Sequence, residues 1–213
     1  MHVVPDILPS LDPTADISIT FSRHLIQPGS FVPSALSETP PSLRIQVFDA
    51  GARLVSIAVV DADVPAPERD GFGYRCHFLA ANVPVSPTAP GVSLRRLGPS
   101  DQVILPWLPP FAQKGSPYHR LAVFVMEQPA GAALDVAAAK AEGVERDGFK
   151  LRGWVDRHGV KPVGASLFRC VWDEGTRGVM ERAGVPGADV EYKRKRIEPL
   201  PEKYRRKDGA RYR

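Results

Sequence analysis

Short apolar runs, several of which alternate with polar residues, dominate the pattern of this chain. Residues 17–21 and 43–47 alternate with a period of two, which is typical of strands with one buried face. Residues 54–60 are almost continuously apolar and β-branched, as expected of a central strand. The predicted strands are residues 17–21, 43–47, 54–60, 77–83, 121–126 and 165–172.

Helical patterns appear only beyond residue 129. Residues 132–145 are rich in alanine, which has the highest helix propensity. Residues 149–157 carry apolar side chains near helical spacing, and residues 174–182 form a third candidate. Loops rich in Pro, Gly and Ser are expected at residues 28–41 and 84–100. Strands followed by helices indicate a mostly β domain with peripheral helices.

The composition agrees with this fold class. The chain has 213 residues, of which 22 are proline, and so many prolines argue against a helical bundle. Hydrophobic residues make up 43% and charged residues 24%, as in ordinary globular proteins. No apolar run approaches the ~20 residues of a membrane-spanning helix, so no membrane insertion is expected.

The two cysteines and the N-terminus bear on the cellular compartment. Cys76 and Cys170 have no metal-type or redox-type spacing, so they are expected to be buried, reduced side chains. Residues 1–16 are predicted to be an extended lead-in rich in Pro and Asp. They resemble neither a secretory signal nor an Arg-rich presequence, because the first basic residue other than histidine is Arg23.

Positive charge is concentrated at the C-terminus. Residues 191–213 contain ten Lys/Arg and four Asp/Glu, a net charge of +6, whereas the rest of the chain has a net charge of −2. Cations that alternate with tyrosines are suited to RNA phosphates and unpaired bases. A solvated end or a nuclear-localisation-like patch is the alternative. The candidate RNA-binding residues are Lys193, Arg194, Lys195, Arg196, Lys203, Tyr204, Arg205, Arg206, Lys207, Arg211 and Arg213.

Candidate site residues stand at the ends of predicted strands. Asp61 and Asp63 follow one strand, His77 begins the next, and His119 precedes the strand at 121–126. Carboxylates can orient imidazoles, and imidazoles with backbone amides can hold an anion. The alternative is structural, with the histidines hydrogen-bonded to loops and the aspartates holding their own Pro-rich loop through backbone amides.

These segments resemble the phosphatidylethanolamine-binding protein (PEBP) family. The family's Asp-Pro-Asp-x-Pro, His-aromatic-Leu, Gly-x-His-Arg and C-terminal Trp-Asp motifs correspond to residues 61–65, 77–79, 115–120 and 164–173. The resemblance implies an antiparallel β-sandwich with an anion pocket lined by Asp61, Asp63, His77 and His119. Because Leu108 stands where many members have glycine, less room remains for a ligand, and we expect a vestigial pocket.

One branch of the family is especially similar, the PEBP-like protein of the large mitochondrial ribosomal subunit. Residues 108–122 and the basic end carry this likeness. It implies ribosomal RNA and other large-subunit proteins as partners, a role in mitochondrial translation in the matrix, and a longer N-terminus. The implied organisation is a lead-in at 1–16, a PEBP-like domain at 17–190 and an RNA-contacting tail at 191–213.

Nothing in the sequence predicts catalysis. A Gly-x-Ser-x-Gly elbow, a phosphate-binding Gly-rich loop and a His-Glu-x-x-His motif are all missing from the sequence. We therefore expect a non-enzyme without cofactor, metal or small-molecule substrate. The alternative function is a free PEBP-type module that binds a phospholipid headgroup or inhibits a protease or kinase.

Overall fold

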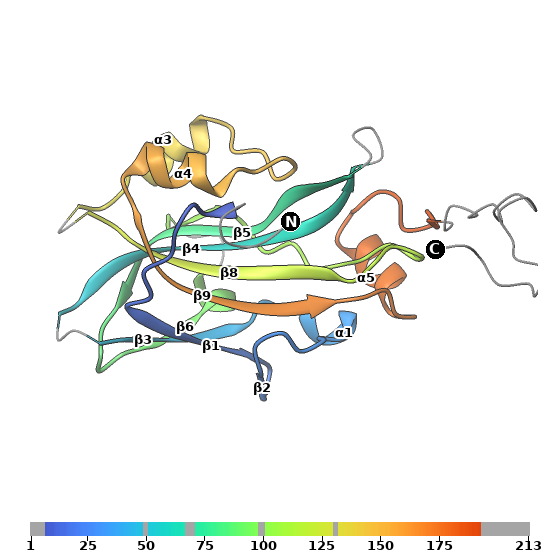
Figure 1. The fold of residues 1–213 in the computed structure, drawn as a ribbon, viewed down its shortest axis with the longest axis horizontal. Helices are drawn as coiled ribbons and strands as arrows, with labels where there is room; N and C mark the ends of the chain where they lie inside the picture. The colour runs from blue at the N-terminus through green and yellow to red at the C-terminus, as the bar shows by residue number, and fades with distance from the viewer. Residues whose placement is uncertain (1–6, 49–50, 67–70, 98–100, 130–131, 193–213) are drawn as a thin grey trace, which may run out of the picture.

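Two antiparallel β-sheets lie face to face, and helices cover one outer face and one end (Figure 1). The computed structural model describes residues 7–48, 51–66, 71–97, 101–129 and 132–192. The main hydrophobic core lies between the two sheets, and a second core lies between the larger sheet and the helices. The predicted mostly β fold with peripheral helices is confirmed.

The smaller sheet has one face in the core and one in solvent. Its strands, in spatial order, are β2 (His24–Ile26), β1 (Ala15–Phe21), β3 (Ser42–Val47) and β6 (Gly91–Ser93). Leu43 and Ile45 of β3 are buried, whereas Arg44 and Gln46 between and after them are exposed. This alternation is the sequence pattern that predicted a half-buried strand.

The larger sheet is covered on both faces. Its order is β7 (Val103–Leu105), β5 (Gly71–Val85), β4 (Arg53–Ala66), β8 (His119–Glu127) and β9 (Lys161–Cys170). Along β4, Val59 faces the core between the sheets and Val60 faces the helices. Because both faces of β4 are buried, residues 54–60 are almost all apolar and do not alternate with polar residues.

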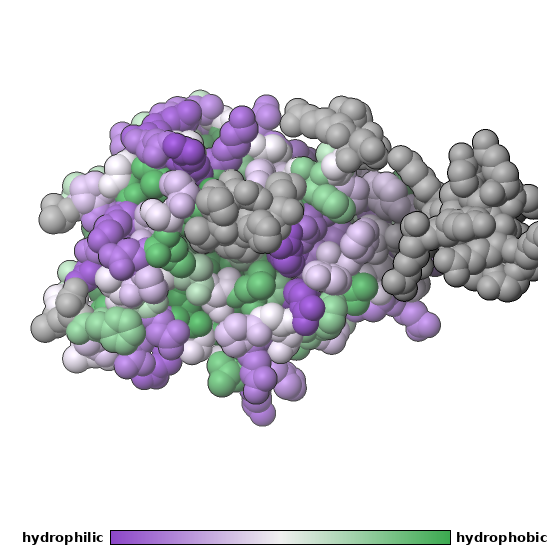
Figure 2. Space-filling view, viewed as in Figure 1, coloured by the Kyte–Doolittle hydropathy of each residue, from purple (hydrophilic) through white to green (hydrophobic). Residues whose placement is uncertain are grey.

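Two helices close the outer face of the larger sheet. They are α3 (Val136–Ala141) and α4 (Leu151–His158). The Asp135 side chain caps α3 by accepting a hydrogen bond from the Ala138 N–H at 2.9 Å. Trp154 of α4 is buried, while the solvent side of the two helices, at the top of Figure 2, is polar.

The remaining helices are short: α1 (Ser34–Ser37), α2 (Leu94–Leu97) and α5 (Thr176–Arg182). Asp173 joins α1 to α5, because its carboxylate accepts hydrogen bonds from the Ser34 N–H at 2.8 Å, the Ser34 hydroxyl and the Thr176 hydroxyl at 2.8 Å. No helix in the part of the chain that the structure describes has the length and apolar character needed to cross a bilayer.

The strand predicted at 54–60 is longer in the structure, so the Pro-rich segment that follows Asp61 is strand and not loop. Strand β4 continues to Ala66, which pairs with Gly71 of β5. The paired register of β4 with β8 ends at Asp61, so beyond this residue β4 has one neighbour only. On the open side of an edge strand a backbone N–H has no neighbouring strand to bond. Proline, which lacks this N–H, is therefore tolerated at position 65.

Other boundaries also differ. The helix predicted at 132–145 spans only Val136–Ala141, and the strand predicted at 165–172 is β9, which spans Lys161–Cys170. The predicted loops contain short elements, namely α1 in 28–41 and β6 with α2 in 84–100. Strand β1 begins at Ala15, two residues before the predicted domain boundary.

The contact between the sheets at Gly164 gives a testable prediction. A β-carbon at this position would lie 2.7 Å from the Ala15 carbonyl oxygen and 3.1 Å from Ile17. Gly164→Ala should therefore push β9 from β1 and lower the free energy of unfolding by about 1–3 kcal/mol, measured by urea denaturation.

Gly153→Ala is the matched control. Gly153 lies inside α4, and an added β-carbon would meet no atom within 4 Å outside its own helix. Its substitution should leave stability unchanged or raise it by up to about 1 kcal/mol. Equal stability of the Gly164→Ala variant and the wild type would contradict the close approach of the sheets.

Candidate functional site

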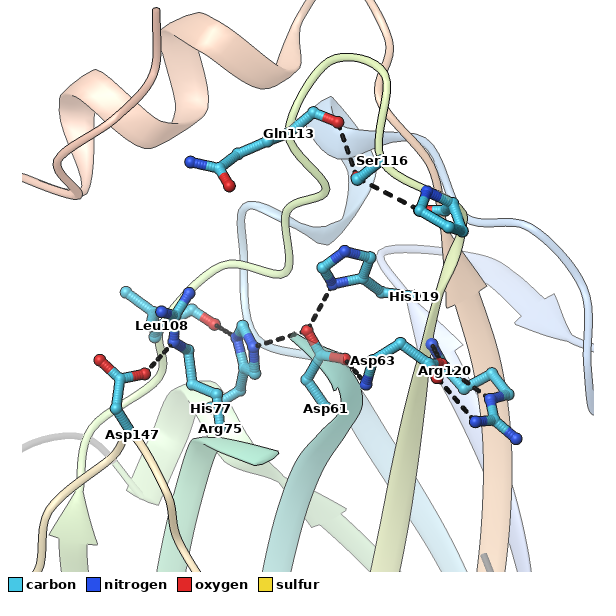
Figure 3. Close-up of polar contacts among 11 residues, drawn as sticks. Asp61, Asp63, Arg75, His77, Leu108, Gln113, Ser116, His119, Arg120 and Asp147 are labelled. Carbon is cyan, nitrogen blue, oxygen red and sulfur yellow. Dashed lines mark hydrogen bonds and ion pairs between the residues drawn. The ribbon is translucent and has the colours of Figure 1, made fainter. Parts of the chain in front are cut away.

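The structure brings the four predicted site residues to one end of the larger sheet (Figure 3). Asp61 and Asp63 lie on β4, His77 lies on β5, and His119 is the first residue of β8. All four are buried, with Asp61, His77 and His119 exposing 1%, 0% and 3% of their surface. Neighbouring strands thus place these side chains together although they are up to 58 positions apart in sequence.

Protein groups occupy both oxygens of the Asp61 carboxylate. Oδ2 accepts a hydrogen bond from Nδ1 of His119 at 2.7 Å, and Oδ1 accepts one from the Asp63 N–H at 2.9 Å. Nε2 of His77 lies 3.9 Å from Oδ2, which is longer than a hydrogen bond but close enough for charge attraction when the ring is protonated. Asp61 therefore organises the site from inside.

Asp63 turns toward a different partner. Its carboxylate forms a two-pronged ion pair with the Arg120 guanidinium, with Oδ2 to Nε at 2.7 Å and Oδ1 to Nη2 at 2.6 Å. It also accepts the Arg120 backbone N–H at 2.9 Å. Such bidentate geometry is among the stronger side-chain interactions in proteins. Asp63 thus fastens β4 to β8.

His77 holds the loop at 106–118. Its Nδ1 lies 2.9 Å from the Leu108 carbonyl oxygen and donates to it, because a carbonyl can only accept. The Leu108 N–H in turn donates to the His77 carbonyl at 2.8 Å. Arg146 reinforces this region by donating to the carbonyls of Cys76, His77 and Pro106 at 3.1, 3.3 and 2.7 Å.

The local environment sets the ionisation of the buried acid. Burial acts to raise the pKa of Asp61. The contacts with His119 and His77, through hydrogen bonding and through charge, lower it by more. The pKa of Asp61 consequently lies well below its ordinary value. Burial raises the pKa of the Cys76 thiol to about 12 and that of the Cys170 thiol well above its ordinary value. Both cysteines are buried, as the sequence predicted, and a raised pKa disfavours the reactive thiolate form.

A cavity of about 410 Å³ lies above this cluster. His119 lines it together with Leu108 and Phe111, whereas Asp61 and His77 are not in its lining. Nε2 of His119 is buried and has no hydrogen-bond partner among the described residues. The cavity therefore borders the His119 side chain, and the Asp61 carboxylate beneath that side chain is sealed from it.

Arginines on the cavity wall are already engaged. Arg75 pairs with Asp147 and lies 5.0 Å from the centre of the Phe111 ring, and Arg146 donates to backbone carbonyls. These residues were missed in the sequence analysis, because nothing in the local pattern of residues 142–149 indicates that this segment turns back over β5. The Arg75–Asp147 bridge across 72 positions depends on that turn.

The segment after α5 closes the far side of the cavity. The Tyr192 N–H donates to the Lys114 carbonyl at 2.7 Å, and the Lys114 ammonium lies 3.4 Å from the Glu191 carboxylate. Gly115 has φ +83°, and a β-carbon there would lie 1.9 Å from the Tyr192 carbonyl oxygen. Only glycine permits this backbone contact.

The arrangement suits a structural centre more than a reactive one. Its carboxylate is ionised, paired and inaccessible. Within the described ranges, His, Cys, Asp and Glu side chains do not gather in threes as a metal site requires. The predicted RNA-binding residues, from Lys193 to Arg213, lie outside the residues that the structure describes.

The ionisation of Asp61 predicts a pH dependence of stability. Because its pKa in the folded state is lower than the unfolded value of about 3.9, the ionised carboxylate stabilises the fold above about pH 4, and this contribution is lost as the pH falls further. Asp61→Asn should lower the free energy of unfolding at pH 7 by about 3 kcal/mol and flatten its decline in acid. Urea denaturation across a pH series measures both effects.

Asp12→Asn provides the control. The Asp12 side chain is 79% exposed and lies 3.8 Å from Lys161, so its loss should cost less than about 1 kcal/mol. A parallel loss of stability in acid for wild type and the Asp61→Asn variant would refute the proposed role of the carboxylate.

Comparison with known proteins agrees with this architecture. The family model for phosphatidylethanolamine-binding protein matches residues 19–166. The large ribosomal subunit protein mL38 of Schizosaccharomyces pombe is 25% identical over an alignment of 205 residues. The match covers 94% of this chain and 63% of that protein's length.

Two solved structures share the fold. The phosphatidylethanolamine-binding protein of Plasmodium vivax superposes with a TM-score of 0.60 at 16% identity, over 81% of this chain and 94% of that one. The carboxypeptidase Y inhibitor, in complex with its cognate proteinase, gives a TM-score of 0.55 at 12% identity over 76% and 85% of the chains. The chain belongs to the phosphatidylethanolamine-binding protein family.

Proposed function

We propose that this chain is a structural component of the large subunit of the mitochondrial ribosome and acts in the matrix in support of translation. The similarity to mL38 over 94% of the chain carries the proposal. In this role the β-sandwich contacts neighbouring ribosomal proteins and ribosomal RNA, and residues 191–213 contact RNA. The protein has no catalytic task.

The geometry of the site supports a structural role. The Asp61 carboxylate and the His77 ring are buried under the loop at 106–118, and both oxygens of Asp61 are taken by protein donors. Arg75 and Arg146, the cations nearest the cavity, are also engaged. A ligand would have to compete with these contacts, whereas a scaffold gains rigidity from them.

The charge of the C-terminal sequence supports RNA contact. Ten Lys/Arg within residues 191–213 can neutralise phosphates and release counterions, which makes binding strongly dependent on salt. The domain itself has a slightly negative net charge, so the tail is the part of the sequence best suited to hold RNA.

A tail deletion tests this proposal. Removal of residues 193–213 leaves Tyr192 and its backbone hydrogen bond to Lys114 in place, so the domain should stay folded. Tagged wild-type protein from mitochondrial lysate should co-sediment with the large subunit on a sucrose gradient, and the deletion should shift most of it to the top. Raising the salt concentration should have the same effect on the wild type.

Two variants make the result specific. Replacing the ten Lys/Arg of the tail with Gln keeps the length and should reproduce the deletion. Replacing Arg95 and Arg96, two exposed cations of α2, with Gln should leave sedimentation unchanged. Wild-type protein found only at the top of the gradient would refute the ribosomal role.

The cavity favours a second candidate, a free module that binds a phosphate-bearing headgroup. Nε2 of His119 faces no partner among the described residues and belongs to a residue that lines the cavity. Under the ribosomal proposal, isothermal titration with phosphoethanolamine should give no saturable binding. Saturable binding that is lost in His119→Ala and kept in His24→Ala, an exposed histidine of β2, would favour the second candidate.

A further inference from the structure

A cluster of two exposed aromatic rings and a half-buried arginine lies at the edge of β9. We name Phe31, Tyr118 and Arg169 the aromatic–arginine patch. The segment at 29–32 runs along β9, where the Gly29 N–H donates to the Leu167 carbonyl at 2.7 Å and the Arg169 N–H donates to the Ser30 carbonyl at 2.9 Å. Backbone pairing therefore fixes Phe31 beside Arg169.

The side chains of the patch are held against one another. The Phe31 and Tyr118 rings meet edge to face with centres 5.8 Å apart. The Arg169 guanidinium carbon lies 4.3 Å from the centre of the Phe31 ring and 5.3 Å from that of Tyr118, and its Nε donates to the Gly29 carbonyl. A rigid surface of this kind loses little conformational entropy when it binds.

The positive charge of the patch is not neutralised within the domain. Arg120, which is opposite Arg169 in the register of β8 and β9, is paired with Asp63. Within the ranges that the structure describes, Arg169 makes no ion pair, and its guanidinium contacts two aromatic rings and a carbonyl oxygen. A cation over aromatic rings thus remains available to an anionic partner.

The rings are also more exposed than a structural role requires. Phe31 and Tyr118 keep 50% and 45% of their surface accessible, although both are held by neighbours. Aromatic residues and arginine together are enriched at binding surfaces, whereas isolated exposed apolar residues are common and need no explanation. The combination here, with fixed geometry and free charge, indicates an interaction surface.

Its position relative to the tail identifies the partner. Tyr192, the last described residue, is hydrogen-bonded to Lys114, four positions before Tyr118 in the same loop. The basic sequence that begins at Lys193 therefore follows a residue that is bonded to the same loop as Tyr118. Exposed aromatic faces stack on unpaired bases, and an arginine beside them binds phosphate, so single-stranded RNA fits this surface better than a protein does.

We infer that the aromatic–arginine patch is a binding site for an unpaired RNA nucleotide, with the base stacked on Phe31 or Tyr118 and a phosphate bound by Arg169. This inference rests on the proposed contact with ribosomal RNA. It adds that the protein prefers single-stranded RNA to duplex RNA. A basic tail alone binds single-stranded and duplex phosphates through the same charge attraction.

Binding of the full chain to a short oligouridylate and to an RNA duplex tests the inference. Because each ring holds the other edge to face, Phe31→Ala and Tyr118→Ala should each weaken oligouridylate binding by at least about fivefold, the lower end for one stacked base. Duplex binding should stay unchanged. Arg169→Lys keeps the charge but loses the planar guanidinium, so it should weaken the single strand more than the duplex. Fluorescence anisotropy gives the affinities.

Matched variants control for fold and exposure. Phe48→Ala removes a ring that is 69% exposed and lies at the opposite end of β3 and β1 from the patch, and it should not alter affinity. Phe31→Leu keeps apolar volume without an aromatic face and should weaken binding as Phe31→Ala does. Thermal unfolding checks that each variant is folded.

The outcomes separate this inference from the proposed function. Oligouridylate containing 4-thiouridine should crosslink to Phe31 or Tyr118. Normal affinity in the patch variants, or crosslinks confined to residues 193–213, would overturn the patch and leave the ribosomal role standing. Reduced incorporation into the large subunit with unchanged RNA affinity would also overturn it, because the patch would then contact protein. A full chain that binds no RNA would overturn both the patch and RNA contact by the tail.

Discussion

The buried carboxylate of Asp61 is the interaction on which this end of the molecule depends. It accepts hydrogen bonds from His119 at the start of β8 and from the N–H of Asp63, and it lies near His77 of β5. Three neighbouring strands thus meet at one charged group. His77 also holds the loop at 106–118, through its hydrogen bond to the Leu108 carbonyl. Because a buried charge is costly without partners, these contacts must form together, which makes the arrangement cooperative.

Much of the fold could be predicted from the sequence, because the burial of a strand determines where its apolar residues stand. The alternation in β1 and β3 indicates strands with one buried face. The nearly continuous apolar runs in β4 and β8 indicate strands buried on both faces. The extension of β4 beyond Asp61 could not be predicted, since it depends on where β8 ends and not on the residues of β4 alone. The short elements α1 and β6 gain their structure from tertiary contacts that leave no periodic signal.

The candidate site was predictable only in part, for a related reason. Predicted strand ends marked Asp61, Asp63, His77 and His119, and the strands bring them together. Only His119 begins a strand, whereas the other three lie within β4 and β5. The sequence did not predict which side chains pair with these residues. Arg120 turns Asp63 away from the cavity, and Arg146 uses its donors on backbone carbonyls. Whether a cluster of polar residues is open or closed depends on such neighbours, which lie far away in sequence and become adjacent only when the chain folds.

The contact between Gly115 and Tyr192 fixes the last described residue against the domain. Since the Tyr192 backbone is pressed against Gly115 and hydrogen-bonded to Lys114, the point where the basic sequence leaves the domain is fixed and not free to swing. A short tether from a fixed point gives a second contact an effective concentration on the order of millimolar. Two individually weak attachments can then act as one strong one. A side chain at position 115 would displace the Tyr192 backbone, so under the proposed RNA contact this glycine would affect avidity without touching RNA.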